Sequence, residues 1–501
     1  MILPLFAVLD NDQKNVFSES PKNGSVLIVG PPGSGKTVVA MHRAIRLSDS
    51  GKVVLGMFNK TLRKYASEFE GKNDNIEVVH IHEWVAKWYE NAFDKTHPTL
   101  RKKYDIDWET IASKIQTANP AQDKKLDWGH MIIDEGQDFP KEMYRAFAKL
   151  LRKPNNENLS LTVFADENQT ITEKNSTIVD IMQELNVSSR DKRHWRLDKN
   201  YRNTLEIAQF SLHFQVLGTK SVTLPDEPGT QPVVFVHKEL NDQLSQIIAF
   251  CGNMKNEEIG VVVLSSSKHT KQIYNKLKNQ VNSANSNYLV QTYIGGKQGE
   301  KWGLDKWDDL IFDKAPSITV LHQVNTKGLE FDVVFVIRMD QLFLNEGAEI
   351  DSYKRLYVTC TRPRKQLFLM NIGTPVEGGG FVRATKFLPE PKKDLCKYFA
   401  VDEDVKEKLK EMLSEVEWLD SASGIVRKKW KPLAKKISKL NNEQIISLIT
   451  KHAKKEFRLD DIEQLISDRI NNGEDRELNI LHTLVELSAK ARKAIAQDME
   501  P

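Results

Sequence analysis

Gly30, Pro31, Pro32, Gly33, Ser34, Gly35, Lys36 and Thr37 fill every position of the phosphate-binding pattern GxxxxGK[ST]. Apolar residues 26–29 precede the pattern and helix-compatible residues 38–47 follow it. A buried strand, a glycine-rich loop and a helix N-terminus surround a polyphosphate with backbone N–H groups and a positive dipole end. In this pattern Lys36 reaches the β and γ phosphates and Thr37 holds Mg²⁺. The stretch therefore predicts a nucleoside triphosphate site.

An acidic pair follows a second apolar run. Residues 130–133 are typical of a buried strand, and Asp134 and Glu135 stand at its C-terminal end, where ligands collect in parallel α/β sheets. We expect Asp134 to share a Mg²⁺ ion with Thr37, and Glu135 to orient or deprotonate the attacking water. A solvated acidic loop is the alternative, which the accompanying P-loop disfavours.

Further sequence blocks follow these two motifs in a fixed order: FADENQ at 164–169, NYR at 200–202, KGLEF at 327–331 and YVTCTR at 357–362. The whole order resembles the superfamily 1 helicases of the UvrD, Rep and PcrA type. The resemblance covers about residues 5–370. It implies an α/β fold of two RecA-like P-loop domains with parallel sheets, ATP in the cleft between them and single-stranded nucleic acid across their top.

The same resemblance assigns roles around the nucleoside. Gln13 matches the glutamine that reads the adenine edge, Tyr201 matches the aromatic residue that stacks on the base, and Glu330 matches the carboxylate that holds the ribose hydroxyl.

Three further residues would act at the γ-phosphate. Gln169 matches the residue that senses this phosphate and couples it to the nucleic acid. Arg202 and Arg362 resemble two arginines that close on it from the second domain. Guanidinium charge delivered in this way stabilises the transferring phosphoryl group and ties hydrolysis to domain motion.

The sequence blocks expected to contact nucleic acid match those of the helicase family less well. Phe58, Asn59 and Lys60 resemble the family's TFTNKA block, and His82 resembles its FHS block; both would touch the strand's backbone. The aromatic pair that the family places after the glutamine of its third block is missing.

Tryptophans offer another way to stack bases. Trp84, with Trp88 and Tyr89, could supply the stacking faces. Trp84 and Trp88 lie one helical turn apart, however, so a core-facing helix stripe is the alternative.

The spacing of the blocks predicts the domain organisation. We expect a first RecA-like domain at 1–195 with a reduced helical insertion at about 84–128, and a second at 196–385 without a large insertion. After a linker at 389–393, helical periodicity predicts an α-helical C-terminal region at 395–501.

Charged residues in the C-terminal region are arranged in blocks of one sign. Residues 421–458 are strongly basic, while residues 401–420 and 459–501 are acidic. These helices could neutralise one another in a bundle, track phosphates or dock a protein partner. The net charge of the whole chain, +3, does not decide among these.

Together these features predict ATP and Mg²⁺ as ligands and single-stranded or tailed DNA as partner, with RNA not excluded. One reading is a translocase or helicase moving 3′→5′, as its relatives do. The other is a nucleic-acid-gated ATPase subunit that signals to a repair or antiviral partner through residues 395–501. With no long apolar segment, no signal peptide and only dispersed cysteines, we expect a cytoplasmic protein without membrane contact.

Overall fold

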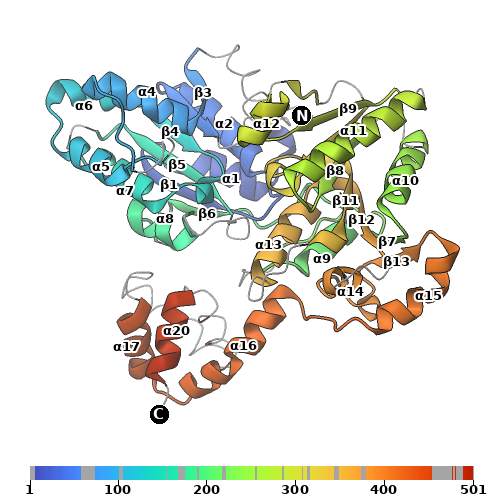
Figure 1. The fold of residues 1–501 in the computed structure, drawn as a ribbon. Coiled ribbons are helices and arrows are strands. Elements are labelled where there is room, and N and C mark those ends of the chain that lie inside the picture. Colours follow the sequence, from blue (N-terminus) through green and yellow to red (C-terminus); the bar gives the residue numbers. More distant parts are fainter. Residues whose placement is uncertain are drawn as a thin grey trace. The chain divides into compact units, whose positions relative to one another are not determined.

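The chain divides into two compact units in the computed structural model. One spans residues 2–198 and takes in the C-terminal residues from 426 onward, and the other spans residues 199–216 and 222–425. Figure 1 draws the elements of both. The structure describes residues 6–57, 74–100, 105–154, 156–166, 175–188, 191–216, 222–253, 257–284, 287–306, 309–312, 316–342, 349–373, 380–453, 477, 480, 484 and 489–499.

The first unit contains a six-stranded sheet in the order β3-β2-β4-β5-β1-β6, and every neighbouring pair in it is parallel. Strands buried on both faces carry continuous apolar runs, as residues 26–29 do. The strands are β1 (Gly24–Val29), β2 (Val53–Met57), β3 (Ile76–His80), β4 (His130–Ile133), β5 (Ser160–Ala165) and β6 (His194–Arg196).

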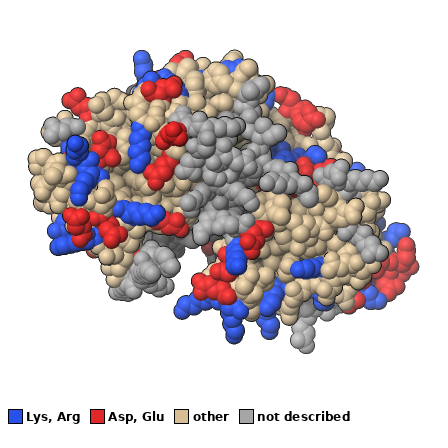
Figure 2. Space-filling model, turned by 90° about the horizontal axis from the view of Figure 1, so that it is seen from above, with Lys and Arg blue, Asp and Glu red and all other residues tan. Residues whose placement is uncertain are grey.

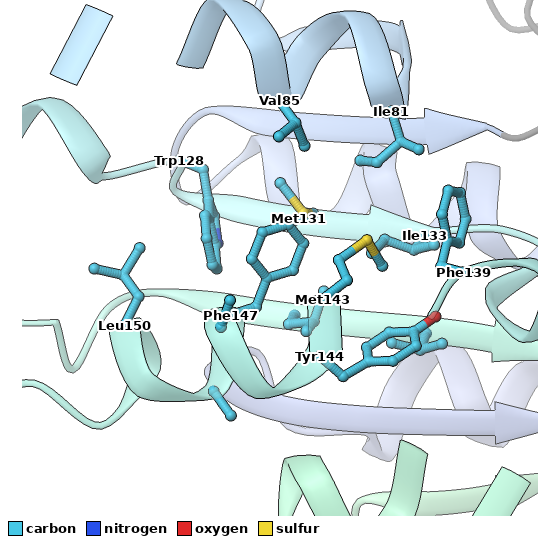
Figure 3. Close-up of a cluster of buried hydrophobic side chains, with 14 of the residues drawn as sticks. Ile81, Val85, Trp128, Met131, Ile133, Phe139, Met143, Tyr144, Phe147 and Leu150 are labelled. Carbon is cyan, nitrogen blue, oxygen red and sulfur yellow. The ribbon is translucent and has the colours of Figure 1, made fainter. Parts of the chain in front are cut away.

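Helices enclose hydrophobic clusters on this sheet. Figure 3 shows part of one cluster, in which Met131 of β4 lies near Val85, Trp128 and Phe147. Helix α7 joins through Met143, Phe147 and Leu150, whose spacing places them on one helix face. The helices of this unit are α1 (Asn11–Glu19), α2 (Lys36–Ser48), α4 (Ile81–Phe93), α5 (Trp108–Gln116), α6 (Pro120–Leu126), α7 (Lys141–Leu151) and α8 (Ile178–Leu185), with short 3-10 turns η1 (Phe6–Val8) and η2 (Gly136–Asp138).

The second unit contains a seven-stranded sheet in the order β13-β7-β12-β11-β8-β10-β9, again parallel throughout. The predicted α/β class is therefore confirmed. The strands are β7 (Val233–His237), β8 (Glu258–Val263), β9 (Leu289–Tyr293), β10 (Ser317–His322), β11 (Phe331–Ile337), β12 (Pro363–Ile372) and β13 (Lys397–Ala400). The helices are α9 (Leu205–Leu212), α10 (Leu240–Asn253), α11 (Ser267–Ser283), α12 (Gly296–Trp302), α13 (Glu349–Cys360), α14 (Gly380–Thr385) and α15 (Glu403–Ser414), with 3-10 turns η5 (Gln323–Asn325), η6 (Met339–Gln341) and η7 (Pro391–Lys393).

Strand β13 departs from the expectation that a helical region begins at residue 395. Residues 397–400 pair in parallel with β7 at the sheet edge. Val405 of α15 and Val416 then pack against Val236 of β7 in a small cluster. A four-residue edge strand is too short to leave a periodic signature. The second sheet therefore extends beyond the expected boundary.

The helices after residue 421 form a small cluster of their own. Helices α16 (Ala422–Ile437), α17 (Asn442–Ala453) and α20 (Ala489–Asp498) enclose buried side chains that include Leu433, Ile437 and Ile495. Figure 1 labels all three helices. No described helix combines the length and apolar character needed to cross a membrane.

Two truncations should differ sharply in stability. A chain ending at residue 425 should stay soluble and melt cooperatively, whereas one ending at residue 394 should not. The shorter chain loses β13 and leaves the apolar side chains around Val236 without cover. Soluble yield and thermal melting followed by circular dichroism would measure this, and equal melting temperatures would contradict the assignment of β13 to the sheet.

Candidate active site

The P-loop connects β1 to α2, and two of its glycines adopt left-handed backbone conformations. Gly33 and Gly35 have φ of 78° and 81°, and Gly35 is the N-cap of α2. A side chain at Gly30 would lie 2.7 Å from the carbonyl of Leu197. Glycine at these positions lets backbone N–H groups approach a phosphate closely. The loop therefore has the cradle shape that the sequence predicts.

Lys36 points into this loop. Its Nζ donates to the carbonyls of Gly30 and Pro31 at 2.8 and 2.9 Å. The same atom lies 3.7 Å from Asp166, the residue that follows β5. The ammonium is buried, with 6% of the side chain exposed. It is thus held inside the loop that would carry the phosphates.

Thr37 and Asp134, the two residues predicted to hold Mg²⁺, are in direct contact. The Thr37 hydroxyl donates to Asp134 Oδ2 at 2.6 Å, although the residues lie 97 positions apart. Burial, followed by the charge of Glu135, raises the pKa of Asp134 to about 6. A hydroxyl and a buried carboxylate are the oxygen donors that Mg²⁺ prefers, and a cation would offset this destabilised charge. The donor set fits the ion.

Glu135 occupies a constrained position at the end of β4. Its φ is 55°, a conformation that few residues other than glycine adopt. The side chain of Gln137 donates from Nε2 to Glu135 Oε2 at 2.5 Å, and its Oε1 accepts from the backbone N–H of Asp166 at 3.0 Å. Gln137 is fully buried. It therefore fixes the predicted catalytic carboxylate against the end of β5, a role that the sequence analysis did not assign.

Removing this amide should lower turnover without weakening nucleotide binding. We expect Gln137→Ala to reduce kcat by about 10²-fold, the cost of misplacing a catalytic group by about 1 Å. KM should change little. Gln137→Glu should be equally impaired, because a carboxylate cannot donate to Glu135. Steady-state ATPase kinetics beside a thermal melt would test this, and a lowered melting temperature with unchanged kcat would indicate a purely structural role.

Gln13 lies against the P-loop. Asp10 and Gln13 form a capping box at the start of α1, in which Gln13 Oε1 accepts from the backbone of Asp10 at 3.2 Å. Gln13 Nε2 donates to the Ser34 carbonyl at 3.1 Å. The structure thus brings the predicted adenine-reading residue to the loop, with both polar atoms of its amide bonded within the protein.

In the second unit, Arg202 and Glu330 form an ion pair. Arg202 Nε lies 2.8 Å from Glu330 Oε2. Tyr201 is 44% exposed, as a residue that stacks on a base must be, and Lys199 Nζ lies 5.6 Å from its ring centroid. Arg364, a residue without a predicted role, approaches Glu330 Oε1 with its Nη1 at 3.6 Å. Glu330 therefore lies between two guanidinium groups.

Arg362 is buried, with 1% of its surface exposed. Its Nε donates to the carbonyl of Val358 at 2.7 Å and its Nη1 to that of Leu329 at 3.3 Å. The guanidinium thus joins the end of α13 to the loop before β11. Its Nη2 donates to the hydroxyl of the neighbouring Thr361 at 3.2 Å.

Trp84 does not offer a face to a nucleic acid. It is 8% exposed and stacks on Trp88 at 5.4 Å within the hydrophobic cluster that also contains Trp128. This corrects the expectation of a stacking residue in favour of the core-facing stripe. The indole is buried because helix α4 lays this face on the sheet.

His82 lies beside His80 and Phe139, with ring centroids 5.6 and 5.9 Å away. Burial, followed by the neighbouring His80 and His97, lowers the pKa of His82 to about 4. Its imidazole is therefore neutral near pH 7. Four predicted site residues lie outside the described part of the chain: Phe58, Asn59, Lys60 and Gln169.

Comparisons with known proteins place the chain in a family. The chain resembles one solved structure, the C-terminal domain of a possible DNA helicase from Lactobacillus plantarum, with 18% sequence identity. The matched region covers 40% of this chain and 98% of the helicase domain's chain. Its TM-score is 0.27, too low to bear on the fold. No curated protein matches the chain. A family model described as Schlafen group 3, DNA/RNA helicase domain, matches residues 24–361, more than half of the sequence. The chain belongs to this family of helicase domains.

Proposed function

We propose that this chain is an ATP-driven motor of the superfamily 1 type, moving 3′→5′ along single-stranded DNA. The observation that carries the proposal is the 2.6 Å contact between Thr37 and Asp134 at the mouth of the P-loop. It joins the two motifs of an ATPase site, with Lys36 in the loop and Glu135 next to Asp134.

Residues of the first unit have separate roles in ATP binding and hydrolysis. Lys36 and the loop N–H groups bind the β and γ phosphates. Thr37 and Asp134 would hold Mg²⁺, which when bound neutralises charge on the phosphate oxygens. Glu135 orients the attacking water and accepts its proton, held in place by Gln137. Gln13 fixes the loop beside the base.

The second unit supplies the remaining groups in this proposal. Arg202 and Arg362 stabilise charge on the γ-phosphate during hydrolysis. Tyr201 stacks on the base and Glu330 holds the ribose hydroxyl. Because Arg362 is buried against backbone carbonyls, it must turn outward to act, so hydrolysis would depend on a conformational change.

The domain roles are part of the same proposal. We assign the first RecA-like domain to residues up to about 198, so that it keeps β6, and the second to residues from about 199, extended to include β13. Figure 2 shows basic and acidic side chains interspersed over the face seen from above.

Strand separation on tailed duplexes tests the direction of movement. A duplex with a 3′ single-stranded tail should be opened in the presence of ATP, and a matched duplex with a 5′ tail should not. Opening of the 5′-tailed duplex alone would overturn the proposed direction. Parallel assays on RNA would decide which nucleic acid is preferred.

A nucleic-acid-gated ATPase that signals to a partner is the second candidate. It is favoured by one observation, the separate hydrophobic cluster formed by the C-terminal helices, which is typical of an attached module. This candidate predicts strand-stimulated hydrolysis without opening of either duplex.

A further inference from the structure

Helix α16 has two chemically distinct faces. At 100° per residue, Leu433, Ala434 and Ile437 fall on one side of the helix. All three are buried in the cluster that the C-terminal helices form. The opposite side carries the exposed lysines at positions 428, 431 and 435. Exposed lysines at 429 and 436 flank the apolar side, and Lys439 follows just after the helix end.

Within the described part of the chain, most of these lysines have no acidic partner. Lys429 lies over the ring of Trp430 at 5.6 Å and Lys436 donates to the Met499 carbonyl at 3.5 Å. Lys428, Lys431 and Lys435 make no ion pair with any residue in the described ranges. Among the residues that the structure describes, no acidic side chain therefore neutralises these three positions.

Lys428, Lys431 and Lys435 are spaced i, i+3 and i+7, so they form one row along the helix axis. With a rise of about 1.5 Å per residue, the row extends over about 10 Å. A row of exposed positive charge suits a linear polyanion, whose repeated phosphates can each meet one ammonium group.

A membrane surface fits this helix poorly. An amphipathic helix that lies on a bilayer inserts its apolar face between the lipids. In α16 that face is already packed in the bundle through Leu433, Ala434 and Ile437. Only the charged face remains for a partner.

We propose that the row Lys428, Lys431 and Lys435 binds the phosphate backbone of single-stranded nucleic acid, giving the motor a contact outside its two sheets. This inference rests on the proposed function, since it names a second binding surface for the same strand. Binding through phosphates carries no base specificity.

The test replaces the row in the full-length chain. K428Q/K431Q/K435Q removes three charges and keeps residues with similar helix propensity. K406Q/K408Q/K410Q on α15 removes the same number of exposed lysines from an acidic helix, where Lys406 already lies 3.3 Å from Glu403. K428R/K431R/K435R keeps the charge. The binding of labelled oligothymidylate is measured by fluorescence anisotropy at several salt concentrations.

The row variant should bind more weakly, and the slope of log K against log salt should flatten by about 0.7 for each lost contact, or about 2 in all. The α15 variant and the arginine variant should both keep the wild-type slope. Circular dichroism should show that all three remain helical.

Two negative results have different meanings. If the wild-type chain binds no oligothymidylate at any salt concentration, the proposed function itself fails. If the wild type binds and the row variant matches it in affinity and slope, only the further inference is overturned. The inference is also overturned if the row variant keeps its affinity for oligothymidylate and loses binding only to vesicles of anionic lipid or to an acidic protein.

Discussion

Glu135→Gln should leave Mg-ATP binding intact and lower turnover by about 10² to 10⁴, the scale for losing a positioned general base. Lys36→Ala, by contrast, should abolish tight Mg-ATP binding. The physical reason is the division of roles within one site. Lys36 lies inside the P-loop, where the phosphates bind, whereas Glu135 stands at the end of β4 and is held by Gln137 for the water.

Binding and turnover must be measured separately to see this difference. Equilibrium titration with a fluorescent ATP analogue gives the affinity, and steady-state hydrolysis gives kcat. Lys14, a half-buried residue whose ammonium donates to the Ala7 carbonyl, offers a matched control as Lys14→Ala. An equal loss of affinity in the Lys36 and Glu135 variants would contradict the assignment of roles.

Arg362→Ala should slow hydrolysis by about 10³-fold or more, with nucleotide affinity changed far less. The reason is that a guanidinium which reaches the γ-phosphate only during hydrolysis stabilises the transition state and not the bound substrate. Single-turnover hydrolysis and ATP titration would measure the two effects.

The buried position of Arg362 requires a control for folding. Its donors bond the carbonyls of Val358 and Leu329, so its loss can also destabilise the second unit. Arg362→Lys keeps the charge without the planar donor geometry and should remain slow. A wild-type rate in a folded Arg362→Ala variant would show that this arginine is structural only.

Local motifs were sufficient to predict the α/β class, and they singled out Thr37 and Asp134, which the structure brings into contact. The P-loop and the acidic pair each follow an apolar strand, and parallel strands bring their C-terminal ends to one edge. The side chains therefore meet although they are far apart in sequence. Such predictions succeed because the strand, the loop and the helix each follow from adjacent residues.

Other features depend on tertiary contacts that no local pattern encodes. The position of Gln137 depends on a hydrogen bond from the backbone N–H of Asp166, a residue that follows a different strand. The one-turn spacing of Trp84 and Trp88 is compatible with a helix that stacks on bases and with a helix that faces the core. Only the burial of Trp84 in the cluster that contains Trp128 distinguishes these two hypotheses. Strand β13 exists because the edge of β7 is there to pair with it. The chemical roles of all the predicted site residues, in both units, stay predictions.

The rate of ATP hydrolysis with and without single-stranded nucleic acid tests the central claim most directly. We expect Mg²⁺-dependent hydrolysis that rises when oligothymidylate is added and disappears in Lys36→Ala. Hydrolysis that is the same with and without the strand would contradict a motor driven along nucleic acid, whatever the P-loop binds.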